Sequence, residues 1–428
     1  MLRPLLVAVS LLTLQAASFA QAPSPAQVLL ERGLTLLESN YYGFKPIDYA
    51  KLEADATLKL QSLCAGQSSC PYSAGTSVLA ETLGSLGDGH SFVLSANRFA
   101  QFNADAANAK LSIVGLKFAE LPDAAALIVT RVRDGSSAER AGLKRGDVVS
   151  SVAGRALSEF RSASDAVSAI TGLEFAGKPF TLGIAGQTTS SSVAANGTTF
   201  TPSTISERQV TLTPEALSPW LPSNTLRSDG IAVITFYQYL TGNQIAAKVH
   251  DYVRQAQAAG ARAVILDVRG SSGGSAFESL ASAGAFMDTV GVRFENKFGS
   301  GASVFENGAI TGTGFRIANP AKWSGPLIVL TNQISRSAAE YMAYFLQRAG
   351  RARVLGEPTA GVLNTSTTVS PLPDGGAIAV TSGRSKTLDG LAHPERIAPD
   401  TVINDDMAAL ARGRDVILER AVQLLNQP

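Results

Sequence analysis

The pattern of apolar and polar residues divides this chain into three stretches of different character. Apolar residues recur at helical spacing over 26–63, and a further helix is expected over about 77–86, where glycines end it. From residue 111 the pattern changes to short apolar runs separated by glycine turns. From residue 230 strand-like and helix-like segments alternate, which is typical of a sheet covered by helices.

These changes of pattern predict domain boundaries. We expect an N-terminal helical cap over 21–110, a β-rich domain over 111–214 and an α/β core over 215–428. In the core, continuous apolar runs predict two buried strands, Ala263–Asp267 and Leu327–Thr331. The other elements expected there are a strand over 231–236 and helices over 243–259, 277–287, 337–348 and 407–425.

One serine lies where a buried strand turns sharply into a helix, in the segment T-N-Q-I-S-R-S-A-A-E (331–340). Ser337 is expected at the turn and Glu340 one helical turn later. The first amides of a helix have no intrahelical partner, so the amides of Ser337 and its neighbour are expected to point outward. A serine that attacks a carbonyl needs such a rigid, amide-rich position, and it also needs a base.

Three histidines are candidate bases. His90 lies in L-G-D-G-H-S-F, where glycines on either side of Asp88 bring the backbone close to a neighbour and leave the imidazole unobstructed. His250 falls within a predicted helix with a charged face and is expected at the surface, and His393 lies in a loop before a proline. His90 is therefore the preferred candidate for a general base.

A second glycine-rich turn follows the strand of V-I-L-D-V-R-G-S-S-G-G (264–274). The amides of Gly273 and Gly274 are suited to holding an anion, either a phosphate or the oxyanion of an acyl-transfer intermediate. The spacing matches neither a dinucleotide fingerprint nor a phosphate-binding loop. Asp267 and Arg269 are expected to pair and shape the turn.

Charge and the N-terminus narrow the classes of function. The 36 basic and 35 acidic residues give a net charge of +1, so no basic excess points to nucleic acid as a partner. The first twenty residues have one arginine, an apolar run and small residues before Ala20, as in a secretory signal peptide over 1–20. A retained membrane anchor is the alternative. We expect a periplasmic or secreted protein with no integral membrane segment after cleavage.

The only two cysteines, Cys64 and Cys70, are six residues apart. In an exported protein a close pair of this kind is expected to form a structural disulfide. Zinc would need two further ligands nearby, and the sequence offers none, so we expect neither a metal nor a cofactor.

The stretch from residue 111 resembles a PDZ domain. The matching features are G-S-S-A-E-R-A-G-L-K-R-G-D-V-V and a G-L-K-F loop formed by Gly115, Leu116, Lys117 and Phe118. The resemblance covers about 111–214 and implies that the loop amides hold a peptide's terminal carboxylate while the peptide adds as an edge strand. A domain kept only as a spacer is the alternative. A Ser- and Thr-rich segment over 185–208 is expected to form an exposed inserted loop.

The ordered set of motifs resembles the carboxy-terminal processing protease (tail-specific protease) superfamily. The set runs from the helical cap through G-D-G-H, the PDZ-like domain, D-x-R-x-x-x-G-G, S-x-x-E and G-E-x-T-x-G to P-D near the end. The resemblance implies an α/β protease core of the crotonase/ClpP-like kind with an inserted PDZ-like β domain. It also implies that Ser337 is the nucleophile, with the amides of Gly273 or Gly274 and of Ala338 as the oxyanion hole.

The sequence departs from that superfamily at one important position. Processing proteases have a lysine base directly after G-E-x-T-x-G, whereas this chain has Val362 there, and valine cannot accept a proton. The tricorn-like Ser-His branch instead uses a histidine from the G-D-G-H segment, which corresponds to His90. A C-terminal acidic residue orients that histidine, and the best candidate is Glu395. Glu395 lies nearer to P-D than this branch usually has its acidic residue, His393 occupies the more usual position, and Asp389 is a weaker option. Lys386 is nearby in the sequence but lies off the motif.

Together these features predict an exported serine endopeptidase that acts on unfolded or C-terminally exposed protein or peptide substrates through an acyl-enzyme. One alternative is a catalytically inactive relative that binds a peptide or a hydrophobic ligand, as some members of the superfamily bind retinoids. A crotonase-like acyl-CoA enzyme is a third possibility, but export argues against it because that cofactor is cytoplasmic.

Overall fold

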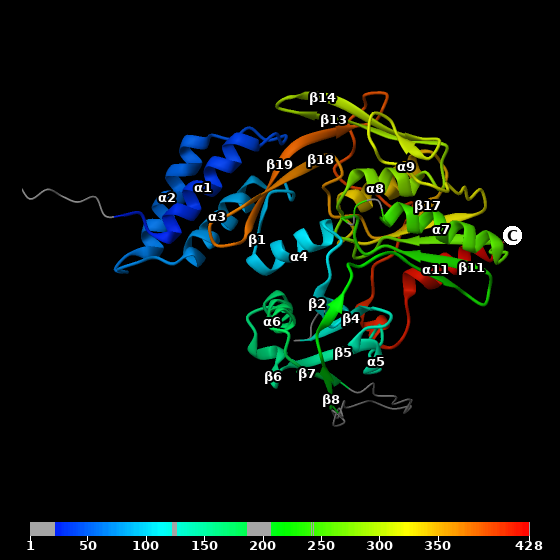
Figure 1. The fold of residues 1–428 in the computed structure, drawn as a ribbon, viewed down its shortest axis with the longest axis horizontal. Helices are drawn as coiled ribbons and strands as arrows, with labels where there is room; N and C mark the ends of the chain where they lie inside the picture. Colours follow the sequence, from blue (N-terminus) through cyan, green and yellow to red (C-terminus); the bar gives the residue numbers. More distant parts are fainter. Residues whose placement is uncertain (1–21, 122–125, 186–206, 241, 243, 428) are drawn as a thin grey trace, which may run out of the picture.

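The computed structural model describes residues 22–121, 126–185, 207–240, 242 and 244–427 (Figure 1). The signal peptide expected over 1–20 lies outside the described residues, as does nearly all of the loop expected over 185–208. No helix in the described part of the chain is both long and apolar enough to cross a membrane.

The α/β core is built on a six-stranded sheet. Its strand order is β10-β11-β12-β16-β17-β20, and all neighbours after the antiparallel β10–β11 pair are parallel. The strands are β10 (Ser223–Leu226), β11 (Ile231–Thr235), β12 (Ala263–Asp267), β16 (Leu327–Thr331), β17 (Arg353–Gly356) and β20 (Thr401–Val402). The bounds predicted for β12 and β16 are confirmed, because strands buried on both faces read as uninterrupted apolar runs.

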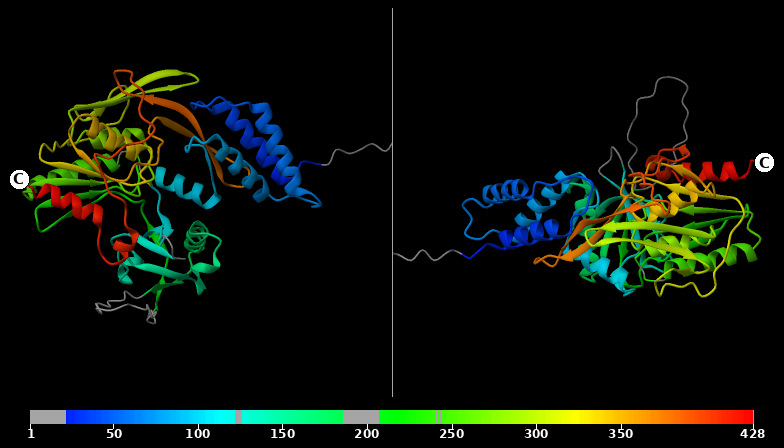
Figure 2. Two further views of the ribbon diagram at one scale, coloured as in Figure 1. Left: turned by 180° about the vertical axis from the view of Figure 1, so that it is seen from behind. Right: turned by 90° about the horizontal axis from the view of Figure 1, so that it is seen from above.

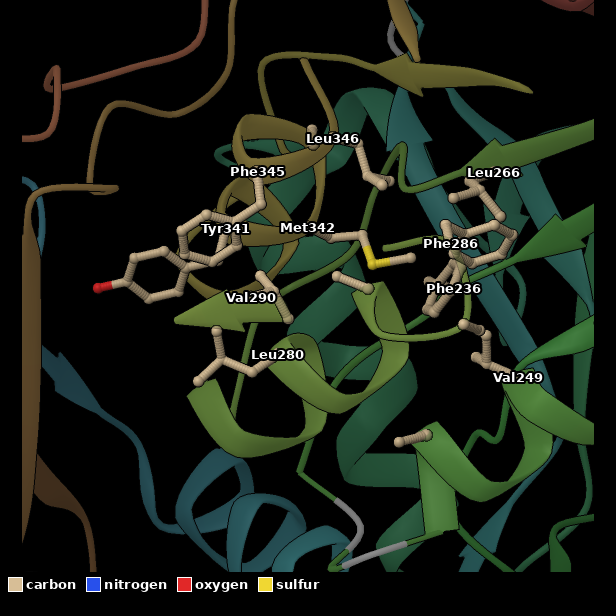
Figure 3. Close-up of a cluster of buried hydrophobic side chains, with 14 of the residues drawn as sticks. Phe236, Val249, Leu266, Leu280, Phe286, Val290, Tyr341, Met342, Phe345 and Leu346 are labelled. Atoms are coloured by element: carbon tan, nitrogen blue, oxygen red, sulfur yellow. The ribbon is translucent and has the colours of Figure 1, made fainter. Parts of the chain in front are cut away.

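Helices cover both faces of this sheet. One face is covered by α7 (Gln244–Ala258), α8 (Ala276–Ala283) and α9 (Ala338–Arg348), with Phe236, Leu266 and Met342 in the shared core (Figure 3). The other face is covered by α11 (Val416–Leu425). The single terminal helix predicted over 407–425 is wrong, because Gly413 interrupts it with a positive φ and leaves a separate short helix, α10 (Met407–Ala411).

A second, antiparallel sheet joins the segment that follows the helical cap to the core. Its order is β1-β19-β13-β14-β15, with β18 also paired to β19. The strands are β1 (Phe92–Leu94), β13 (Thr289–Asn296), β14 (Gly299–Glu306), β15 (Ala309–Ile310), β18 (Thr365–Pro371) and β19 (Ala377–Lys386). Because β1 begins two residues after His90 and pairs with β19, this sheet holds the G-D-G-H segment against the core.

The helical cap consists of α1 (Pro25–Asn40), α2 (Tyr49–Cys64) and α3 (Tyr72–Leu86). It packs on the hairpin formed by β18 and β19, whose apolar residues share its core (Figure 1). The expected Cys64–Cys70 disulfide is present and closes the turn between α2 and α3. A fourth helix, α4 (Ala96–Ala106), follows β1.

The PDZ-like domain is a separate β structure inserted between α4 and the core. Its sheet has the order β3-β4-β5-β7-β8, with the short β6 paired to β5. The elements are β3 (Leu116–Glu120), β4 (Leu127–Val132), α5 (Ser137–Arg140), β5 (Val148–Val152), β6 (Arg155–Ala156), α6 (Ala163–Phe175), β7 (Phe180–Ala185) and β8 (Glu207–Leu212). The entering strand β2 (Leu111–Ile113) pairs with the leaving strand β9 (Glu215–Leu217).

A cluster of buried charges fixes the PDZ-like domain to the core. Arg131 on β4 donates to Asp267 at the end of β12 (2.8 Å), and Arg145 donates to Asp415 before α11 (2.5 Å). Arg269 lies between them and pairs with both aspartates, so the expected Asp267–Arg269 pair is confirmed. Figure 2 shows the C-terminal segment running past this domain. The cluster thus connects the PDZ-like domain, the end of β12 and the segment before α11.

Candidate active site

Ser337 sits at a strained turn between β16 and α9. Its φ is +54°, a conformation that side-chain-bearing residues rarely adopt, and it is the N-cap of α9. The buried Oγ has no hydrogen-bond partner within the described part of the chain. The expectation that the Ser337 amide is free is wrong, because that amide donates to Oε2 of Glu340 at 2.7 Å. The turn therefore presents an uncommitted hydroxyl on a fixed backbone.

Glu340 connects the serine turn to the G-E-P-T-A-G segment. Its carboxylate also accepts hydrogen bonds from the Thr359 hydroxyl (2.5 Å) and from the amides of Gly361 (3.1 Å) and Val362 (3.2 Å). Burial raises the pKa of Glu340, while these hydrogen bonds act in the opposite direction. The glutamate of S-x-x-E is thus a structural anchor for the loop that carries Val362.

Gly273 lies directly against the serine. A Cβ built on this glycine would stand 2.8 Å from Cβ of Ser337 and 3.3 Å from the amide nitrogen of Ala338, so no side chain fits there. Ala338 is the first residue of α9, where amides have no intrahelical acceptor. Gly274 faces the backbone of Tyr239 instead, because a Cβ on Gly274 would stand 2.4 Å from the carbonyl carbon of that residue. The structure thus brings Gly273 and Ala338 together beside Ser337.

His90 is buried, with 4% of its surface exposed, and its loop is held by Asp88. The Asp88 carboxylate accepts hydrogen bonds from the amides of His90 (3.1 Å) and Ser91 (2.8 Å). The ring nitrogen Nδ1 of His90 lies 2.8 Å from the hydroxyl of Thr365, at the start of β18. The ring is therefore fixed by the hydroxyl of the first residue of β18, the strand that follows G-E-P-T-A-G.

Two contacts join the histidine segment to the serine turn. Nη2 of Arg336, the residue before the serine, donates to the carbonyl of Gly89 at 2.9 Å. A Cβ on Gly89 would lie 3.4 Å from Cγ1 of the buried Val362. The G-D-G-H segment thus packs on the residue that replaces the lysine of the processing proteases.

The environment of His90 favours its neutral form. Burial lowers the pKa of His90, the positive charge of Arg336 lowers it further, and Asp88 opposes them, which leaves the pKa at about 4. At neutral pH the imidazole is therefore uncharged and able to accept a proton.

The structure does not bring Glu395 to His90. The side chain of Glu395 is 66% exposed and lies 3.8 Å from Arg396, whereas its backbone carbonyl accepts from the amide of Leu363. That backbone bond turns the carboxylate outward. The alternative residues also have other partners, namely Ser385 for His393, Arg348 for Asp389 and Glu295 for Lys386. Thr365, a residue that none of the sequence motifs contains, takes the position beside His90.

The prediction that His250 is a surface residue is wrong. The ring is fully buried between α7 and its neighbours, where Nδ1 accepts from the amide of Ala321 (2.9 Å) and Nε2 lies 3.0 Å from the carbonyl of Ala281. Both ring nitrogens are thus used in packing α7 against the core.

In the PDZ-like domain, the G-L-K-F segment begins at a glycine turn and continues along β3, the edge strand of the sheet. Lys117 points away toward the core, where its Nζ donates to the carbonyl of Tyr237 at 3.1 Å. Burial lowers the pKa of Lys117 to about 8. Leu116 and Phe118 are partly buried against the domain's own core.

Comparisons with known proteins agree with this architecture. Residues 230–403 match the model of peptidase family S41, and residues 128–174 match that of the PDZ domain. A carboxyl-terminal-processing protease of Picosynechococcus is 30% identical over 198 residues, covering 44% of this chain and 45% of the relative. The carboxy-terminal processing protease CtpA of Bacillus subtilis is 26% identical over 188 residues, covering 41% and 38%. The chain thus matches less than half the length of these curated relatives.

Solved structures with the same fold cover nearly the whole chain. A putative S41 protease from Bacteroides fragilis has a TM-score of 0.56 at 15% identity, covering 92% of this chain and 96% of that one. The photosystem II D1 C-terminal processing protease has a TM-score of 0.50 at 19% identity, covering 90% and 96%. Together these matches identify a peptidase family S41 domain over residues 230–403 of this chain and a PDZ domain over 128–174.

Proposed function

We propose that this protein is an exported serine endopeptidase that hydrolyses peptide bonds in unfolded or C-terminally exposed proteins through an acyl-enzyme. Ser337 Oγ attacks the scissile carbonyl, and His90 accepts the serine proton as general base. The amides of Gly273 and Ala338 stabilise the oxyanion that forms, while Gly274 shapes the turn behind them.

The observation that best supports this assignment is the hydrogen bond from Arg336 to the carbonyl of Gly89. It joins the residue before the nucleophile to the residue before the base, across about 250 residues of sequence and an inserted domain. Since Val362 occupies the lysine position, we assign the role of base to His90, whose neighbour Gly89 contacts both Arg336 and Val362.

The histidine tautomer follows from its partner. When Nδ1–H donates to the Thr365 hydroxyl, Nε2 keeps its lone pair and is free to take the proton of Ser337. The imidazolium formed then gives this proton to the amine that leaves, and a water molecule hydrolyses the acyl-enzyme by the same steps. Thr365 acts as a positioning residue for the base.

Three features support export and a protein substrate. The Cys64–Cys70 disulfide is typical of an oxidising compartment. The PDZ domain provides an edge strand, β3, of the kind to which extended peptides add. Finally, the curated relatives are named as carboxyl-terminal processing proteases, which act on polypeptides.

Cleavage of an unstructured protein tests this function. The mature chain should degrade casein at neutral pH, and Ser337→Ala should abolish degradation without lowering the melting temperature. Wild-type protein that leaves casein and a panel of unfolded proteins intact would contradict the proposal, as would full activity of Ser337→Ala.

The inactive, ligand-binding relative remains as a second candidate. One observation favours this candidate: the group that holds His90 is a hydroxyl and not a carboxylate. A protonated His90 would therefore receive less electrostatic stabilisation than the histidine of a Ser-His-Asp triad. Peptide binding without cleavage by the wild type would support this candidate.

A further inference from the structure

The expected carboxylate loop of the PDZ domain is the G-L-K-F segment, Gly115 to Phe118, and Val114 directly precedes it. The segment leads into the edge strand β3, and apolar residues of β3 and α6 are partly buried on the domain core. In PDZ domains a peptide pairs with this edge strand, and loop amides hold its terminal carboxylate.

Two backbone carbonyls at the start of this loop point toward α5 and the end of β4. The carbonyl of Val114 accepts from the amide of Ala138 (3.2 Å), and the carbonyl of Gly115 accepts from the amide of Arg133 (2.9 Å). A Cβ on Gly115 would lie 2.4 Å from Cβ of Ser136, so the loop is packed tightly against this wall. The loop amides are therefore available on the face opposite these carbonyls.

A carboxylate of the protein itself is bound at the start of this loop. Oε1 of Glu174, in the last turn of α6, accepts a hydrogen bond from the Val114 amide at 2.8 Å. Glu174 thus makes, at the amide directly before Gly115, the kind of amide–carboxylate hydrogen bond that the loop is expected to make with a peptide's terminal carboxylate.

We infer that Glu174 is a resident occupant of the carboxylate loop, so that a peptide with a free C-terminal carboxylate binds there only when Glu174 is protonated or displaced. Two carboxylates at one small loop repel each other, and a single amide cannot satisfy both. Glu174 therefore sets which peptides bind this domain and at what pH.

The pKa of Glu174 places this change near neutral pH. Burial raises it to about 7, and the bond from the Val114 amide acts in the opposite direction. The charged residues on the elements around α6 are Arg98 and Asp105 on α4, Lys110 before β2 and Lys178 after α6. None of these four forms an ion pair with Glu174 in the described part of the chain. Glu174 is therefore neutral below about pH 7 and ionised above it.

Peptide affinity should follow the neutral fraction of Glu174. A peptide carboxylate stays ionised between pH 6 and pH 8. If the peptide binds only the neutral form, its apparent dissociation constant rises about tenfold between these two values. Lys117, whose pKa is about 8, is the other nearby group that titrates in this range, but its side chain faces Tyr237.

The test measures fluorescence anisotropy of a labelled neutral decapeptide ending in valine, bound to the mature chain carrying Ser337→Ala. With a free carboxylate, the peptide should bind about tenfold more weakly at pH 8 than at pH 6. Adding Glu174→Gln should restore at pH 8 the affinity seen at pH 6. Adding Glu159→Gln, which removes an exposed carboxylate of the same domain, should change neither value, and the amidated peptide should show no such dependence on pH.

Three outcomes would overturn the inference: a pH-independent affinity of the starting protein, a pH dependence that persists in Glu174→Gln, or no binding by Glu174→Gln at any pH. A persistent dependence would assign the titration to Lys117. Because the serine is already replaced, none of these results depends on whether Ser337 and His90 form a protease site.

Discussion

Nδ1 of His90 and Oγ1 of Thr365 lie 2.8 Å apart in the protein interior, where both residues are buried. A hydroxyl in this position fixes the ring through a hydrogen bond but adds no negative charge. The serine–histidine pair proposed for this protein therefore relies on packing and on one neutral hydrogen bond to orient its base.

The first prediction concerns this hydrogen bond. Thr365→Val keeps the shape of the residue but removes the acceptor, and it should lower kcat/KM for an unfolded substrate about tenfold, the effect of one lost hydrogen bond. Thr365→Ser should retain most of the activity. Steady-state proteolysis measures both values, with circular dichroism as a check on folding.

Glu395→Gln serves as the matched control, because its carboxylate lies at the surface beside Arg396. It should leave kcat/KM unchanged. A loss in Glu395→Gln with none in Thr365→Val would return the orienting role to Glu395.

The second prediction concerns pH. The base must be neutral, and the pKa of His90 lies at about 4, first because of burial and then because of the Arg336 charge. Arg336→Gln removes that charge, so the pKa of His90 should rise and the acid limb of kcat/KM should move to higher pH. Arg336→Lys keeps a positive charge and should shift the limb less. Identical acid limbs in the wild type and Arg336→Gln would contradict the proposed effect of the Arg336 charge on the pKa of His90.

The third prediction tests the oxyanion site. Gly273→Ala places a methyl group 2.8 Å from Cβ of Ser337, and activity should fall about 100-fold or more as the amides are displaced. Gly270→Ala is the control, because this glycine also has a positive φ (+70°) but no atom within 4 Å of its Cβ position. Equal losses in both variants would attribute the effect to backbone strain alone.

The fourth prediction concerns stability. Asp415→Asn leaves Arg145 and Arg269 without their shared carboxylate and should lower the free energy of unfolding by about 2–3 kcal/mol. Asp288→Asn, which alters a 98% exposed partner of Lys322, should change it by less than about 1 kcal/mol. Urea denaturation at pH 7 compares the two, and equal effects would contradict a structural role for the cluster.

The same cluster predicts a direction of pH dependence. Burial alone would raise the pKa of Asp267, but Arg269 and Arg131 outweigh it and lower the pKa to about 2. Asp415 is shifted in the same direction. A lowered carboxylate pKa stabilises the fold above the ordinary value near 4 and loses this contribution as the pH falls toward 2. The deficit of Asp415→Asn should therefore shrink between pH 5 and pH 2.

Local signals predicted the elements that carry the chemistry. Uninterrupted apolar runs gave β12 and β16 with correct bounds, and the turn after β16 placed Ser337 at the head of a helix. The glycines around Asp88 indicated a close backbone approach, which the structure shows as packing of Gly89 on Val362.

No local sequence pattern indicated which residues contact one another across the site. A threonine such as Thr365 is common in strands, and only the pairing of β1 with β19 brings His90 to it. Glu395 was the best acidic candidate near the C-terminal P-D, but its side chain is exposed beside Arg396. Long-range pairing of this kind is not encoded in any one segment.

The most direct measurement of the central claim is the rate at which a fluorophosphonate probe labels Ser337 in the mature protein and in His90→Ala. Mass spectrometry identifies the labelled residue, and thermal melting confirms that both proteins are folded. We expect labelling of the wild type at Ser337 and a rate at least about 100-fold lower in His90→Ala, the contribution of a general base. Equal labelling rates in the two proteins would contradict the assignment of His90 as the base that activates Ser337.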